Sequence, residues 1–107
     1  MREFLHVDDL ANAILFALEN TLKDHLYNVG TGSDLKIKDL AKIIQKEVGH
    51  KGKVVWDKSK PDGTPRKLLD ISKIKNIGWI PKITLHDGIN KTYKWFLNNQ
   101  HREVKFK

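Results

Sequence analysis

The opening stretch of the chain, REFLHVDDLA at residues 2–11, decides the fold because it joins two different periodicities. Side chains at residues 2–7 alternate between two faces, which predicts a short strand. Asp8 or Asp9 then caps a helix that extends to about Glu19, with apolar residues at helical spacing. The apolar face of this helix is broad, so we expect it to be buried on more than one side.

Two further helices are predicted from the same spacing. Apolar residues recur at helical intervals over residues 37–48, and Gly49 follows where a helix should end. Lys36 stands at the start of this helix, where Ser or Thr would cap better. The last helix begins at a capping box headed by Thr84 and extends to about Gln100. The residues of this helix expected to face inward are Leu85, Ile89, Tyr93, Phe96 and Leu97.

Short apolar runs between turn residues predict three more strands, at residues 26–29, 53–57 and 68–71. Ser72 is expected to cap a brief helical turn that Gly78 closes. The resulting order, β-α-β-α-β-β-α-α, predicts an α/β fold. We expect a small mixed sheet with flanking helices.

The composition is typical of one globular domain. Of the 107 residues, 39% are hydrophobic and 31% are charged, which favours a folded chain over a disordered one. We expect this domain over residues 1–100 and a frayed tail over residues 101–107. The absence of cysteine excludes disulfides, thiolate catalysis and cysteine metal sites. No apolar run approaches the ~20 residues of a membrane helix, and no signal peptide is recognisable. We therefore expect a cytoplasmic location and no membrane partner.

The net charge of +7 favours anionic partners. Twenty Lys and Arg residues stand against thirteen Asp and Glu residues, a balance that attracts phosphates, nucleotides or nucleic acid. A lysine-rich solvated surface would give the same excess. The lysines are spread along the chain, which argues against a nucleic-acid stripe. Trp56, Trp79 and Trp95 could stack on bases, but we expect each of them to pack in the core.

Two short motifs near the amino terminus could carry chemistry, and each has a simpler structural explanation. His6 and the two aspartates that follow it could bind a metal or act as an acid/base pair, but a third convergent ligand is missing. We prefer a helix cap there and predict no metal site. The turn at residues 30–32, Gly-Thr-Gly, lacks the third glycine and the register of a dinucleotide-binding fingerprint. We therefore expect a plain turn.

The loop at residues 59–67, SKPDGTPRK, is the strongest candidate for a binding site. Pro65 restricts the residue before it and so pre-orders the backbone. The guanidinium of Arg66, beside Lys67, can clamp a phosphate, and Asp62 can accept hydrogen bonds from a sugar hydroxyl. Together these groups could hold the diphosphate and one sugar ring of a nucleotide sugar. A surface loop whose charges pair locally is the alternative.

Four segments of the chain resemble the C-terminal part of the GDP-L-fucose synthase family, a branch of the extended short-chain dehydrogenases/reductases. The resemblance extends to about Gln100. The segment at residues 59–70 is close to a signature for this branch, whereas the others occur broadly among nucleotide-sugar epimerases. The four segments are residues 2–11, 28–32, 59–70, and 78–79 together with the helix that contains 92–97.

The resemblance implies a role in binding the substrate. Members of the family convert GDP-4-keto-6-deoxy-D-mannose to GDP-L-fucose by epimerisation at two carbons and reduction with NADPH. In the family, the residues that match Arg2 and Asp62 contact the GDP-sugar, and Arg66 and Lys67 would lie nearby. We therefore expect a GDP-sugar ligand held by Arg2, Asp62, Arg66 and Lys67.

Most of that family's catalytic machinery is missing from these residues. The cofactor loop, the serine and the Tyr-x-x-x-Lys pair belong to an N-terminal Rossmann domain, and here Tyr93 is followed directly by Lys94. The family's epimerisation His and Cys also lie upstream. We therefore expect a fragment without the Rossmann domain, with no catalytic residue and no cofactor bound by this chain alone. NADP serves the full-length family.

A fragment of such a protein leaves apolar surface uncovered. The helix at residues 9–19 and the strand at residues 26–29 would pack on the missing Rossmann domain, so we expect self-association, as a homodimer or by domain swapping. Two other readings stay open. The chain could be a fragment of another nucleotide-sugar epimerase or reductase, or a small basic module that binds nucleic acid.

Overall fold

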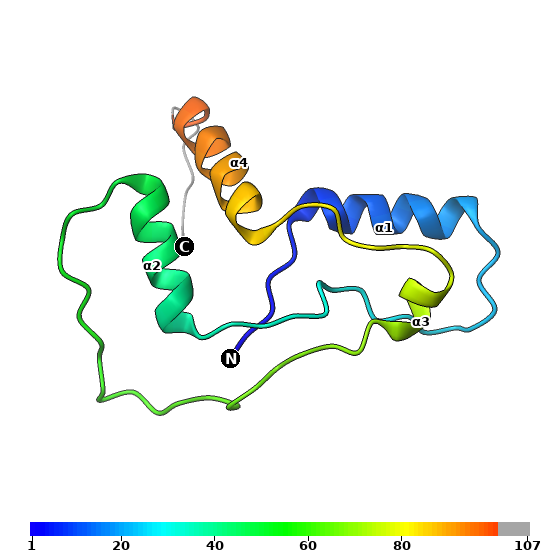
Figure 1. Ribbon diagram of the computed structural model, residues 1–107, viewed down its shortest axis with the longest axis horizontal. Coiled ribbons are helices and arrows are strands. Elements are labelled where there is room, and N and C mark those ends of the chain that lie inside the picture. Colours follow the sequence, from blue (N-terminus) through cyan, green and yellow to red (C-terminus); the bar gives the residue numbers. More distant parts are fainter. Residues whose placement is uncertain (101–107) are drawn as a thin grey trace.

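Four helices make up the regular structure of residues 1–100, the part of the chain that the computed structural model describes (Figure 1). They confirm the four predicted helices, with ends displaced by a few residues. The predicted tail at residues 101–107 lies outside the described residues. The helices are α1 (Val7–Glu19), α2 (Ile37–Val48), α3 (Ser72–Asn76) and α4 (Leu85–Asn98).

The predicted sheet does not form among the described residues. The segments at residues 2–7, 26–29, 53–57 and 68–71 contain no regular strand. Two isolated bridges stand in its place, one antiparallel between Arg2 and Leu35 and one parallel between Arg2 and Lys67. A ladder requires several consecutive residues beside a neighbouring chain, and these extended segments meet only where they pass Arg2.

The ends of the helices show which capping predictions were right. Gly49 closes α2 in the left-handed conformation (φ 70°), and Thr84 caps α4 by accepting from the Asp87 amide at 3.2 Å. Lys36 makes no side-chain cap, as expected. The prediction that Asp8 or Asp9 caps α1 was wrong. His6 is the cap, and its Nδ1 accepts from the Asp8 amide at 3.0 Å.

The start of α3 also differs from the prediction. Ser72 is the first residue of this helix rather than its cap. The carboxylate of Asp70 takes over the capping role, since its Oδ1 accepts from the Ser72 amide at 2.9 Å. The helix is short, and Gly78, with φ 111°, follows its end.

A small core lies between α1 and the segment that contains α3. Four hydrophobic residues are buried, and four more are partly buried against them. The radius of gyration is 16.9 Å, compared with about 13 Å for a compact domain of this length, so the arrangement is open. The buried residues are Ala13, Ile71, Ile74 and Trp79, and the partly buried ones are Leu5, Phe16, Tyr27 and Val29.

The three tryptophans do not share one environment. Trp79 is 5% exposed and belongs to the core, as predicted. The same prediction was wrong for Trp56 and Trp95, which are 48% and 58% exposed. Trp56 lies in a long segment without helices, where every residue from 49 to 70 is exposed.

Asp9 is a buried carboxylate that connects α1 to the segment leading into α4. Its side chain is 1% exposed. It accepts hydrogen bonds from the amides of Lys82, at 3.1 Å, and Ile83, at 3.0 Å. These two bonds satisfy a charge that would otherwise be costly to bury. They hold the amino-terminal end of α1 next to the segment that leads into α4.

The outer side of α1 carries an apolar stripe that is exposed to solvent. The prediction that this helix is buried on more than one side was therefore wrong for the described residues, whereas the expected uncovered apolar surface is present. None of the four helices is long and apolar enough to cross a membrane. The stripe consists of Val7, Leu10, Ile14 and Leu18, whose exposed fractions are 68%, 43%, 56% and 79%.

We expect Asp9→Asn to lower the free energy of unfolding by about 1–3 kcal/mol, because one of the two buried amides loses its acceptor. Urea denaturation followed by tryptophan fluorescence measures this difference. Asp8→Asn is the matched control. Asp8 is exposed and also lies in the first turn of α1, so both variants remove the same favourable charge from the helix terminus. Equal stability of the two variants would contradict a special role for Asp9.

Candidate functional site

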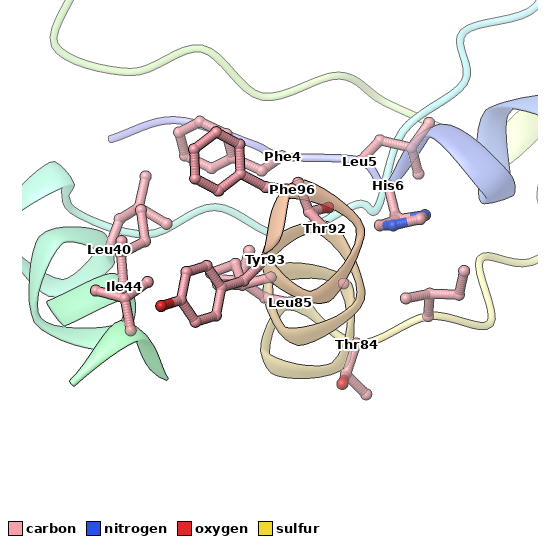
Figure 2. A pocket seen from close by; sticks show the side chains of 14 residues that line it. Phe4, Leu5, His6, Leu40, Ile44, Thr84, Leu85, Thr92, Tyr93 and Phe96 are labelled. Atoms are coloured by element: carbon pink, nitrogen blue, oxygen red, sulfur yellow. The ribbon is translucent and has the colours of Figure 1, made fainter. Parts of the chain in front are cut away.

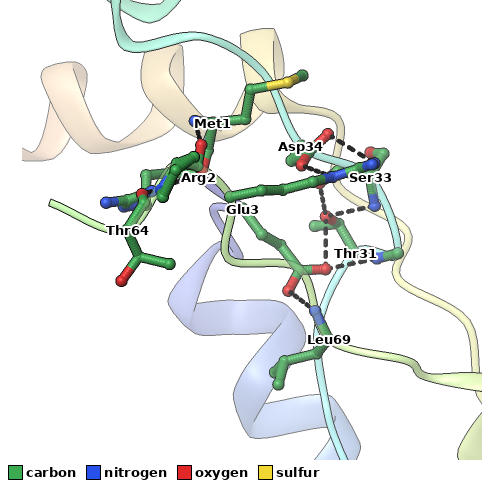
Figure 3. A network of polar contacts seen from close by, with 11 residues as sticks. Met1, Arg2, Glu3, Thr31, Ser33, Asp34, Thr64 and Leu69 are labelled. Atoms are coloured by element: carbon green, nitrogen blue, oxygen red, sulfur yellow. Dashed lines mark hydrogen bonds and ion pairs between the residues drawn. The ribbon is translucent and has the colours of Figure 1, made fainter.

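The loop at residues 59–67 is held in place by the first residues of the chain (Figure 3). The Lys67 amide donates to the carbonyl of Met1 at 3.1 Å. The guanidinium of Arg2 donates through Nη1 to the carbonyls of Met1, at 2.8 Å, and Thr64, at 2.5 Å. The Lys67–Met1 and Arg2–Thr64 bonds each cross more than sixty residues of sequence, and they bring Arg2 and Lys67, two of the predicted site residues, together.

Arg2 and Lys67 both line an open hollow on the surface. They are paired in the parallel bridge, and the hollow of about 400 Å³ between them is also lined by Glu3, Leu68 and Leu69. Within residues 1–100, Lys67 has no ion pair. Two cations that line the same open hollow suit an anionic ligand such as a diphosphate.

Arg66 differs from its neighbour because its charge is already compensated. Its Nε lies 2.7 Å from Oδ2 of Asp34, and its Nη2 lies 3.4 Å from Oδ1, so the guanidinium and carboxylate pair at two points. The Asp34 side chain is only 5% exposed, whereas that of Arg66 is 61% exposed. The alternative of local charge pairing therefore holds for Arg66, and sequence reasoning missed Asp34 as its partner.

Asp62 is exposed beside the point where the loop passes Arg2. A Cβ added at Gly63 would lie 3.2 Å from Nη2 of Arg2, so the backbone follows the guanidinium closely. Asp62 itself has no side-chain hydrogen bond to another residue among residues 1–100. Its carboxylate therefore keeps its full capacity to accept from a hydroxyl.

A tight turn precedes the loop. Oδ1 of Asp57 accepts from both the hydroxyl of Ser59, at 2.6 Å, and the amide of Ser59, at 2.9 Å. These two bonds, the hydroxyl first, hold the pKa of Asp57 below its ordinary value of 3.8. The turn sets the direction in which the chain enters the loop.

The Gly-Thr-Gly turn at residues 30–32 is filled by a carboxylate of the chain itself. Oε2 of Glu3 accepts from the Gly32 amide at 2.7 Å and from the Thr31 hydroxyl at 3.3 Å. A Cβ at Gly30 would lie 2.7–2.8 Å from the same carboxylate. The donors that a cofactor phosphate would need are thus in use, so the turn does not fit a dinucleotide.

A larger apolar groove lies between α2 and α4 (Figure 2). It has a volume of about 500 Å³. Four of the five residues predicted to face inward from the last helix line it, so they point at an open groove rather than a closed core. Its lining is almost entirely hydrophobic and offers no acid/base pair. Residues that point into it include Phe4, Leu40, Ile44, Leu85, Tyr93 and Phe96.

Comparison with known proteins shows that the chain is similar to nucleotide-sugar epimerases and GDP-L-fucose synthases. The model of the NAD dependent epimerase/dehydratase family matches residues 1–30. GDP-L-fucose synthase of Escherichia coli (strain K12) is 53% identical over 112 residues, and GDP-L-fucose synthase 1 of Arabidopsis thaliana is 50% identical over 99 residues. These matches cover 95% and 92% of this chain. The predicted resemblance to GDP-L-fucose synthases is therefore confirmed.

The same matches cover a minor part of the relatives. The chain spans 35% of the Escherichia coli protein and 31% of the Arabidopsis thaliana protein. Among solved structures, a GDP-6-OMe-4-keto-L-xylo-heptose reductase from C. jejuni has a TM-score of 0.84 at 39% identity, over 92% of this chain and 31% of that one. A UDP-glucose 4-epimerase from Thermotoga maritima has a TM-score of 0.79 at 29% identity, over 94% and 32%. The described fold thus corresponds to about a third of nucleotide-sugar epimerases and reductases.

We expect Ser59→Ala to raise the pKa of Asp57 toward 3.8, because the hydroxyl is the larger cause of its lowering. The measurement is an NMR titration of the side-chain carboxyl carbons. A carboxyl whose pKa is lowered by folding stabilises the turn above its ordinary pKa, and this contribution disappears as the pH falls through the folded value. Asp70 is the internal control. The pKa of its carboxyl is lowered mainly by the hydrogen bond from the Ser72 amide, so Ser59→Ala should leave it unchanged. An unchanged Asp57 midpoint would contradict the assignment.

Proposed function

We propose that this chain is the substrate-holding part of a GDP-L-fucose synthase. Its similarity to GDP-L-fucose synthases over nearly its whole length supports the proposal. The complete enzyme would epimerise GDP-4-keto-6-deoxy-D-mannose and reduce it with NADPH. Because the chain spans about a third of its relatives, its own share of this work is to hold the nucleotide sugar.

The observation that carries this proposal is the bridge between Arg2 and Lys67. It brings two cations from distant parts of the sequence to one hollow, where they can contact the two phosphates of GDP. Asp62, which is exposed beside them, accepts from a sugar hydroxyl. Arg66 serves mainly to anchor the loop through Asp34, so its part in ligand binding is smaller than the sequence predicts.

The chemical steps belong to residues outside this chain. Hydride and proton transfer in the family require a Tyr-x-x-x-Lys pair, which this sequence lacks. NADP would also bind elsewhere, because Glu3 fills the glycine turn. A solved relative, GDP-mannoheptose C4 reductase from Campylobacter jejuni, has NADP bound. The cytoplasmic location stays a prediction from the sequence.

We expect the chain to bind GDP, and Arg2→Ala, Asp62→Ala and Lys67→Ala each to weaken that binding. A charge-assisted hydrogen bond contributes about 1.5–3 kcal/mol, which corresponds to roughly 10–100-fold in affinity. Titration calorimetry at low ionic strength measures the dissociation constants. Lys60→Ala is the matched control for Lys67→Ala, because it removes the same charge from an exposed position of the same loop that has no ion pair among residues 1–100. It should weaken GDP binding less.

Other results would reject this proposal. Failure to bind GDP, or equal affinity for UDP, would favour another nucleotide-sugar epimerase or reductase. Binding to single-stranded RNA, with affinity falling steeply as salt rises, would favour the nucleic-acid module. Oxidation of NADPH by the purified chain in the presence of the keto-sugar substrate would contradict its inactivity.

We also propose that the exposed apolar stripe on α1 makes the isolated chain self-associate. Replacing Ile14 and Leu18 by lysine should shift the chain toward the monomer, because burial of both side chains is lost. Sedimentation velocity over a range of concentrations measures this shift. Asn12→Lys adds charge at another exposed position of the same helix and should leave association unchanged. A monomeric wild-type chain at high concentration would contradict the proposal.

A further inference from the structure

We infer that Glu3 is a positioning residue for the GDP-sugar site, an inference that rests on the proposed function. Glu3 follows Arg2 directly in the sequence. Its carboxylate contacts two segments that are distant from each other, the turn at residues 30–32 and the chain just beyond the loop at residues 59–67 (Figure 3). It therefore connects the loop to the rest of the chain.

Each carboxylate oxygen of Glu3 has its own partners. Oε2 accepts from the Gly32 amide at 2.7 Å and the Thr31 hydroxyl at 3.3 Å. Oε1 accepts from the Leu69 amide at 3.3 Å. Hydrogen bonds to an ionised group are stronger than those between neutral groups. A neutral amide in place of the carboxylate would keep the shape of the side chain but could not accept on both sides.

The loop depends on such polar contacts because it has no apolar anchor. Every residue from 49 to 70 is exposed, so no side chain of this segment is buried in the core. Leu69 lies two residues beyond Lys67, and Arg2 lies one residue before Glu3. The Glu3–Leu69 bond therefore acts together with the Lys67–Met1 and Arg2–Thr64 bonds to set the distance between the two chain segments that present the cations of the site.

Gly30 gives independent support for this role. A Cβ at this position would lie 2.7–2.8 Å from the Glu3 carboxylate, which is closer than such atoms approach in proteins. Gly30 does not have a positive φ, so alanine brings no backbone strain there. The flexible end of Glu3 would move instead and would leave its three donors. Gly30→Ala is therefore a second way to remove the same contacts.

The test compares Glu3→Gln and Gly30→Ala with Asp9→Asn in the 107-residue chain. Asp9 is the matched control, because its carboxylate also accepts from two backbone amides but holds a segment away from the loop. Amide hydrogen exchange by NMR is read at Lys67, whose amide bonds to Met1 and not to Glu3. GDP affinity is measured in parallel by calorimetry.

We expect Glu3→Gln and Gly30→Ala to speed exchange at Lys67 and to weaken GDP binding about tenfold each. The double variant should be no weaker than either single one, because both remove one set of contacts. Asp9→Asn should leave Lys67 exchange and GDP affinity within about twofold of wild type, although it lowers overall stability.

The inference would be overturned if the hydrogen-exchange rate of the Lys67 amide were unchanged in Glu3→Gln and Gly30→Ala. It would also be overturned if Asp9→Asn increased that rate by the same factor. If Glu3→Gln unfolds the chain, Gly30→Ala decides. If the wild-type chain binds no GDP, the proposed function fails, while exchange at Lys67 still decides whether Glu3 positions the loop.

Discussion

An extended backbone needs hydrogen-bond partners, and here the segment around Arg2 finds them in two distant parts of the chain. The Arg2 amide donates to the Leu35 carbonyl at 2.9 Å, and the Leu35 amide donates back at 3.0 Å. On the opposite side of the segment, the Lys67 amide donates to the Met1 carbonyl at 3.1 Å. Backbone hydrogen bonds therefore hold this segment on both of its sides. The loop, the hollow and the glycine turn all take their positions from this crossing.

The helices could be predicted from the sequence because the signals that form them are local. The spacing of apolar residues over 37–48, the left-handed Gly49 and the cap at Thr84 each act within one or two turns. The strands could not be predicted in the same way. A strand is stable only beside a neighbour, and in the described residues the extended segments have neighbours only at Arg2.

The candidate site shows the same division between local and distant information. The sequence indicated the loop and its cations, since proline, glycine and paired bases stand together there. It gave no sign that Asp34 would compensate Arg66, or that Asp9 and Glu3 would be held by distant backbone amides. The local sequence around an acidic residue does not reveal whether its carboxylate will contact solvent or a backbone amide some seventy residues away. Such partners become visible only when the chain is folded.

The exposure of residues 49–70 also affects how this protein can change during evolution. Amino-acid substitutions at exposed positions usually alter the free energy of unfolding by less than about 0.5 kcal/mol. This stretch can therefore accept many of them without destabilising the helices. The anchors at Arg2, Glu3 and Asp34 lie outside it. Substitutions in this stretch can therefore change the side chains that the loop exposes while the residues that hold the loop stay the same. The exposed surface of the loop can thus vary independently of the contacts that position it.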